Sequence, residues 1–261
     1  MKALIGFRAN QLVSPLALRL YGLGWALGAL ALWALSGFEL LPGPFEVSRE
    51  LARLFSQGLA FHLASSLCSS IVALIWTAGI ALALVYSSVV PVLRPVTAFV
   101  ENVRFWGFAG VSVAFTLWFG GGHSLKIALL VFGMVGFFVA SMHDSVRGIP
   151  RERFDYARAL GMSEWRVTWE VVVRGTLDTA FDVLRQNAAM GWMLLTLVET
   201  LVRSEGGIGV LLANESKHMR LAALLAVQVV VFLVGLLQDA LLVTLKRLAC
   251  PHAVLKLERM V

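Results

Sequence analysis

Between Arg151 and Arg174 the sequence gathers charged and large apolar side chains in one short stretch. Nine of these 24 residues are charged, and Tyr156, Leu160 and Met162 stand among them. Apolar side chains among arginines and carboxylates suit a surface that docks onto a soluble partner protein. The alternative is a solvated loop whose charges only set the topology of the chain.

A second set of polar residues recurs at intervals of seven. Arg185, Trp192 and Glu199 fall near one face of a helix, with a drift of about 20° per heptad. Ionisable side chains inside a membrane helix usually face a protein interior or a water-filled path. Together with Asn187, these three residues are therefore candidates for lining the translocation path of a solute. Alternatively, Arg185 reaches the inner membrane surface and Glu199 the outer one, and neither contacts a solute.

The sequence does not indicate a site for a metal or a nucleotide. Cys68 and Cys250 have no CxxC spacing, and no two histidines have the spacing of metal ligands. The GGGH at 120–123 lacks the lysine of a GxxxxGKS/T phosphate loop, and no other such loop is present. We therefore expect a chain that is not an enzyme and has no metal or cofactor of its own.

The composition predicts a protein of the lipid bilayer. Of its 261 residues, 59% are hydrophobic and 15% are charged, whereas soluble domains carry about 25% charged residues. The net charge of +6 would raise the question of nucleic acid in a soluble protein. In a membrane protein, lysine and arginine mark the cytoplasmic loops. We therefore expect contacts with lipid and none with nucleic acid.

Six segments are apolar and long enough to predict transmembrane helices, because one crossing needs about 20 residues. The first is free of charge from Leu20 to Phe38, longer than the apolar core of a signal peptide, so we expect it to be retained. If the N-terminus is inside, 16 of the 22 lysines and arginines fall on the inner side and six, Lys126 among them, on the outer side. This bias predicts an all-α membrane protein in one domain, residues 1–261, with six transmembrane helices and both termini cytoplasmic. The predicted spans are 16–37, 64–86, 105–122, 125–142, 183–202 and 221–243.

Two of the connections between these spans are predicted to be helical. Within the connection 147–175, between spans 4 and 5, residues 151–174 would cost roughly 20 kcal/mol to bury in lipid, so we expect this connection outside it. There Pro150 can open a first helix, Gly161 suits the left-handed residue that ends it, and Ser163 can cap a second helix. In the first outer loop, Ser48 is the candidate N-cap of a helix that lies along the membrane or packs against neighbouring loops.

The chain resembles the permease subunits of binding-protein-dependent ABC importers, which have the MetI-like fold. Asp155-Tyr156-Ala157 followed by Gly161 is similar to the EAA…G loop of these permeases. The residues around it are closest to the nitrate, sulfonate, taurine and bicarbonate group. ETLVRSEGGIGVLL, which begins at Glu199, resembles an outer loop of that group, and the stretches 41–47 and 62–67 also fit.

This resemblance implies a function and a set of partners. In the family, the EAA loop forms cytoplasmic coupling helices that sit on an ATPase subunit and transmit its motion to the spans. The implied partners are ABC ATPase subunits that bind ATP and magnesium, a second permease subunit of the same or a sister sequence, and a periplasmic or extracellular solute-binding protein. The implied location is the bacterial inner membrane. The residues that the resemblance assigns to coupling are Asp155, Tyr156, Ala157, Leu160, Gly161 and Met162.

The sequence also departs from the family. Asp155 stands where the family has glutamate, and Arg174 and Asp178 stand where it has prolines, so we expect straighter helices after the loop. Two other classes of function stay open at this point, a secondary transporter or channel and a membrane scaffold that transports nothing. A secondary carrier would favour two related halves with buried coupling carboxylates, and the sequence contains no such repeat.

Overall fold

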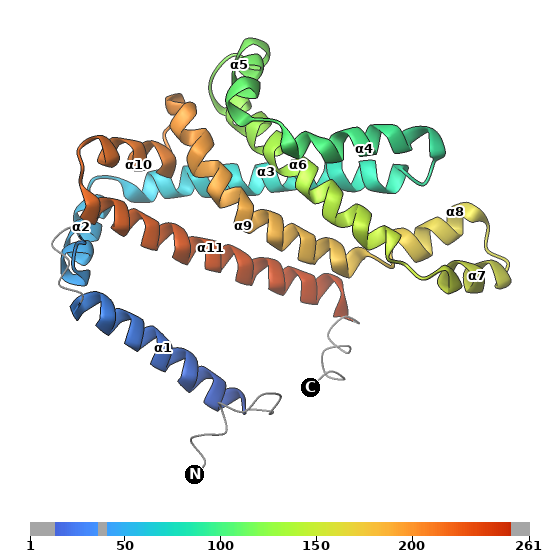
Figure 1. Cartoon of the computed structure of the whole chain (residues 1–261), viewed down its shortest axis with the longest axis horizontal. Coiled ribbons are helices and arrows are strands. Elements are labelled where there is room, and N and C mark those ends of the chain that lie inside the picture. The colour runs from blue at the N-terminus through green and yellow to red at the C-terminus, as the bar shows by residue number, and fades with distance from the viewer. Residues whose placement is uncertain (1–13, 36–40, 252–261) are drawn as a thin grey trace.

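The computed structural model describes residues 14–35 and 41–251, and every regular element within those ranges is a helix (Figure 1). The all-α class predicted from the sequence is therefore confirmed for this part of the chain. The charges at Lys2, Arg8, Lys256 and Arg259, which entered the topology count, lie outside the described residues. So does the end of the first predicted span, at 36–37.

Four long helices lie side by side as the body of the protein (Figure 1). They are α3 (Leu59–Ser87), α6 (His123–Arg147), α9 (Leu177–Leu201) and α11 (Leu221–Ala249). Helix α6 packs along both α3 and α9, and α11 packs along α9. Two clusters of buried apolar side chains hold them, one around Leu129 and Leu195 and the other around Phe138 and Val183.

Length and composition allow four of the described helices to cross a membrane: α1 (Pro15–Leu35), α3, α6 and α11. Helix α9 has 25 residues, which is about 37 Å and long enough to cross. It carries four charged residues, Asp178, Asp182, Arg185 and Glu199, whereas α6 and α11 carry three each and α3 carries none. Its charges therefore need partners inside the protein.

Helix α1 stands apart from the other long helices (Figure 1). Large side chains are exposed around it, including Leu18 at 64% and Trp25 at 79%. Near the C-terminal end of α1, the indole nitrogen of Trp33 donates to the backbone oxygen of Pro42 at 3.1 Å. Apolar side chains exposed on all sides of one helix need lipid or another protein to cover them.

The third predicted span, 105–122, contains one helix, α5 (Phe108–Phe119). Before it the chain forms α4 (Arg94–Asn102) and a turn at Val103–Phe105. Trp106 is extended, with ψ of 133°, so the helix breaks before Gly107. Helix α5 alone is about 18 Å long, shorter than a hydrocarbon core of about 30 Å. An apolar run without charges did not reveal this break.

Close packing against α6 accounts for the position of α4. A Cβ atom at Gly136 would lie 2.9 Å from the backbone nitrogen of Arg104, so only glycine allows this approach. Beyond it, Glu101 contacts His143 at 3.1 Å between Oε2 and Nδ1. Arg104 therefore lies against the middle of α6.

Four of the short helices lie at the two ends of the body. Helices α2 (Pro44–Ser56) and α10 (Ile208–Lys217) lie at one end, and α7 (Arg151–Ala159) and α8 (Glu164–Val167) lie at the other (Figure 1). Helix α2 begins at Pro44 with Gly43 as its N-cap, so the prediction of Ser48 as the cap is wrong. Ser48 instead donates to the backbone oxygen of Phe45 at 2.8 Å.

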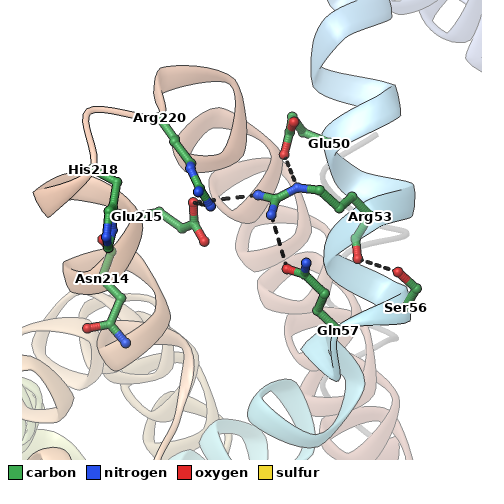
Figure 2. A network of polar contacts seen from close by, with 8 residues as sticks. All are labelled: Glu50, Arg53, Ser56, Gln57, Asn214, Glu215, His218 and Arg220. Atoms are coloured by element: carbon green, nitrogen blue, oxygen red, sulfur yellow. Dashed lines mark hydrogen bonds and ion pairs between the residues drawn. The ribbon is translucent and has the colours of Figure 1, made fainter.

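Arg53 fastens α2 to its neighbours, as Figure 2 shows. Its Nε donates to Glu50 at 2.6 Å, and another guanidinium nitrogen lies 3.6 Å from a carboxylate oxygen of Glu215 on α10. Arg220, just before α11, approaches the same Glu215 oxygen at 3.5 Å. One buried carboxylate thus joins three helices at this end.

Candidate functional site

The polar stretch folds into what we call the α7–α8 element, residues 151–173. Helix α7 ends at Ala159, and Gly161 two residues later has φ of 75°. The nitrogen of Met162 donates to the oxygen of Ala157 at 3.3 Å, and that of Gly161 to the oxygen of Arg158 at 2.9 Å. These two bonds form a Schellman motif, which needs the left-handed residue that glycine supplies. The predicted order of helix, glycine break and helix is confirmed.

Arg158 fixes the angle between the two helices. Its guanidinium donates to both carboxylate oxygens of Glu164, at 2.8 and 3.1 Å, and to Asp155 at 3.3 Å. These hydrogen bonds lower the pKa of the Glu164 carboxyl below its ordinary value and raise the pKa of Arg158. The bidentate pair across the turn fixes the angle between the two helices. It adds little to the stability of the protein, because both groups are exposed to water.

Large apolar side chains of this element face away from the protein. Tyr156 is 69% exposed, Leu160 59% and Trp165 73%. A hollow of about 400 Å³ lies beside them, between α7 and the segment after α8, and Leu160 and Met162 line it. Exposed aromatic and aliphatic side chains beside a hollow are typical of a protein interface.

The six residues that the resemblance assigns to coupling therefore lie together in one turn and its flanks. Asp155, Tyr156, Leu160 and Gly161 are exposed, Met162 is partly buried, and Ala157 is buried against the element. Sequence reasoning missed the exposed Trp165 and Trp169 and the clamp made by Arg158. The spacing of four between the two tryptophans could have placed them on one helical face.

The α7–α8 element is connected to α9 by a distorted segment. Helix α8 runs into a π-helical segment, Thr168–Val173, in which the nitrogen of Arg174 donates to the oxygen of Trp169. Three turn residues follow before α9 begins at Leu177. The hydroxyls of Thr176 and of Tyr86 on α3 lie 3.2 Å apart and tie this joint to the body. The expectation of straighter helices here is wrong, because the π-turn breaks the helix where no proline does.

Two of the four predicted path residues are joined to α11. Arg185 donates to both carboxylate oxygens of Asp239, each at 2.8 Å. Trp192 donates from its indole nitrogen to Gln238 at 2.8 Å and is 6% exposed. Asn187 is buried too, and its amide donates to the backbone oxygen of Val183 at 3.1 Å.

Glu199, the fourth, is the centre of a sealed cluster that we call the Glu199 cluster: Glu199, Lys126, Ser66 and the backbone of Ile208 and Gly209. Glu199 and Lys126 are both fully buried, with 2.6 Å between oxygen and nitrogen. The Ser66 hydroxyl donates to the same oxygen at 2.7 Å, and the nitrogen of Gly209 donates to the other oxygen at 2.8 Å. The nitrogen of Ile208 donates to Ser66 at 2.9 Å.

The cluster corrects one sequence-based assignment. Lys126, counted above as an outer-side charge, lies buried in the first turns of α6. A Cβ atom at Gly207 would lie 2.3 Å from the Glu199 carboxylate, and Gly207 has φ of 123°, so glycine is required there. The place of Glu199, Trp192, Asn187 and Arg185 in a solute path stays a prediction, and their partners give them another use within the subunit.

Comparison with known proteins gives a consistent result. The taurine transport system permease protein TauC of Escherichia coli is 27% identical over 135 residues, 52% of this chain and 49% of the relative. A putative aliphatic sulfonates transport permease protein, SsuC of Escherichia coli, is 27% identical over 132 residues, 51% of this chain and 50% of the relative. A putative ABC transporter permease protein of Methanocaldococcus jannaschii is 25% identical over 122 residues, 47% of this chain and 46% of the relative.

The matched region spans about half the length of these curated relatives. A family match covers far more of the chain, from residue 3 to residue 248. The α7–α8 element and the Glu199 cluster both lie within it. The chain belongs to the family of inner membrane components of binding-protein-dependent transport systems.

Proposed function

We propose that this chain is the permease subunit of an ATP-driven importer for a small organic sulfonate. The observation that carries the proposal is the α7–α8 element, a rigid turn with Tyr156, Leu160 and Trp165 exposed beside a hollow. Cytoplasmic ATPase subunits bind ATP and magnesium and grip this element. The names of the taurine and aliphatic sulfonate relatives support the solute class.

The proposed topology has six crossings with both termini in the cytoplasm. The crossings are α1, the α3 helix, the broken pair α4 and α5, then α6, α9 and α11. Helices α2 and α10 face the outside, where a solute-binding protein delivers the solute. The α7–α8 element faces the inside, and its separation from α2 and α10 along the body supports this assignment (Figure 1).

In this assembly a second permease subunit completes the path. Arg185, Trp192 and Glu199 hold α9 against its neighbours, since each has a partner within the subunit. The other face of α9 carries Met193, 72% exposed, and Leu197, 47% exposed, and this face meets the second permease across the path.

Purification of the tagged chain from its own cells tests the coupling assignment. We expect the wild type to bring down an ATPase subunit and ATP hydrolysis that requires magnesium. Leu160→Glu should abolish both, because it places a charge in the apolar contact. Phe45→Glu is the matched control, since Phe45 is 73% exposed at the opposite end of the body.

Two results would count against the proposal. If the wild-type chain is purified intact without any ATPase subunit, the proposed association with an ATPase is contradicted. Full ATPase recovery with Leu160→Glu would move the contact away from the α7–α8 element. Uptake of radiolabelled taurine into proteoliposomes that hold the complete complex tests the solute class separately.

A further inference from the structure

A second hollow lies at the junction between the α7–α8 element and the body. Its volume is about 340 Å³. We call it the inner pocket and define it by the residues that line it, which come from the ends of α3 and α6, the start of α4, helix α7 and the π-helical segment. They are Ser88, Val89, Arg94, His143, Val146, Arg147, Phe154, Thr168 and Val172.

The inner pocket is lined by positive charge. Arg94 and Arg147 both line it, and neither forms an ion pair with a carboxylate in the described part of the chain. Arg94 uses its Nε to donate to the backbone oxygen of Ser88 at 3.3 Å, which leaves its two terminal nitrogens for other acceptors. None of the nine lining residues is Asp or Glu.

The other polar groups of the pocket are already engaged. Nδ1 of His143 contacts the Glu101 carboxylate at 3.1 Å, and only its second ring nitrogen remains. The hydroxyls of Ser88 and Thr168 donate to backbone oxygens, at 2.6 and 3.0 Å. Ligand binding in this pocket therefore depends mainly on the two guanidinium groups.

We propose that the inner pocket binds an oxyanion of the phosphate or sulfonate class through Arg94 and Arg147. Guanidinium groups match the oxygens of such anions in charge and in geometry. Phe154, Val146 and Val172 supply an apolar wall for the carbon attached to the anion. An anionic lipid headgroup and a free solute share this chemistry, and basic pockets at the inner ends of membrane helices are known headgroup sites.

A bound anion would tie the α7–α8 element to the body. It would bridge α4 and α6, which carry the arginines, to α7 and the π-helical segment, which carry Phe154 and Thr168. Occupancy of the pocket would therefore favour one position of the element. The pocket and its charges do not depend on the proposed transport function, but the inner side, and with it the lipid headgroup source, rests on the topology proposed above.

Binding of inorganic phosphate to the full chain tests the free-solute source. The chain is placed in nanodiscs of phosphatidylcholine, and phosphate is titrated while its ³¹P relaxation is measured. We expect saturable binding that Arg147→Gln and Arg94→Gln each weaken by about tenfold or more, the usual loss for one charge-assisted hydrogen bond. Arg147→Gln should disturb the fold less than Arg94→Gln, because Arg147 makes no side-chain hydrogen bond with another described residue.

A parallel measurement tests the lipid source. Native mass spectrometry of the full chain from mixed phosphatidylglycerol and phosphatidylcholine micelles should show one retained phosphatidylglycerol, which both variants lose. Arg166→Gln is the control for general charge, since Arg166 is exposed on α8 and outside the pocket. Binding in either measurement that the pocket variants weaken and the control does not supports the proposal and names the source. The proposal is overturned if neither ligand distinguishes wild type from Arg147→Gln, or if Arg166→Gln weakens binding equally.

Discussion

Replacing Lys126 by methionine should destabilise the protein strongly. The substitution keeps a similar side-chain volume but leaves the Glu199 carboxylate fully buried without its counter-charge. The hydroxyl of Ser66 and the nitrogen of Gly209 remain as donors. Breaking a buried pair by removing one partner typically costs about 3–5 kcal/mol, most of it for the uncompensated charge.

This cost can be converted into a melting temperature. For a chain of this size, 1 kcal/mol corresponds to about 2–4 °C, so Lys126→Met should lower Tm by about 6–20 °C. The measurement is the fraction of chain that stays monodisperse in size-exclusion chromatography after heating in detergent. Lys217→Met is the control, because Lys217 is exposed on α10 and its loss should change Tm by no more than about 2 °C.

A double variant separates the ion pair from simple packing. Lys126→Met combined with Glu199→Gln removes both charges and keeps an oxygen that accepts from Ser66. We expect most of the lost stability to return, because a buried pair replaced as a whole costs little. The reasoning is refuted if Lys126→Met leaves Tm unchanged, or if the double variant falls by the sum of the two single ones.

Three further predictions concern single contacts. Gly207→Ala should lower Tm by several degrees, because its Cβ would lie 2.3 Å from the Glu199 carboxylate at a φ of 123°; an unchanged Tm would mean that the loop relaxes freely. Tyr86→Phe should cost about 0.5–1.5 kcal/mol and raise hydrogen exchange at residues 174–176, because it removes the contact with Thr176; exchange as slow as in the wild type would contradict this. The Glu164 carboxyl has a lowered pKa, so its clamp should be fully present above its ordinary pKa of 4.5 and be lost as pH falls through the lower folded value. Backbone hydrogen exchange of residues 160–166, corrected for the pH dependence of the intrinsic exchange rate, should rise in that acid range in the wild type and not in Glu164→Gln. A wild-type exchange rate that does not change with pH would contradict the role of this clamp.

Local signals made the α7–α8 element predictable. A glycine after a breaker-free helical run, followed by Ser163 and Glu164, specifies the end of one helix and the start of the next without distant contacts. The glycine has the left-handed φ that the sequence suggested. Ser163 stands at the N-cap position but makes no side-chain capping bond. The start of the helix was therefore predicted correctly, but the capping hydrogen bond was not.

Long-range packing decided what the sequence left open. The spacing of sevens found the polar face of α9, but Lys126 is 73 positions from Glu199, and no periodicity relates two different helices. A count of charges gives the side of the membrane on which a lysine falls and not whether it is buried. The close approach of Arg104, just after α4, to Gly136 was not predicted for a similar reason, since it depends on contacts between helices.

The joint at residues 174–176 governs how force would travel through the protein. A continuous α-helix would carry a bending moment along one regular ladder of hydrogen bonds, but here three turn residues separate the π-helical segment from α9. Two backbone hydrogen bonds still cross the joint, from the nitrogen of Thr176 to the oxygen of Val172 at 3.1 Å and from the nitrogen of Leu177 to the oxygen of Arg174 at 3.5 Å. The contact between Thr176 and Tyr86 ties the joint to α3. A displacement of the α7–α8 element would therefore push α3 and α9 as one block, and would not twist α9 alone.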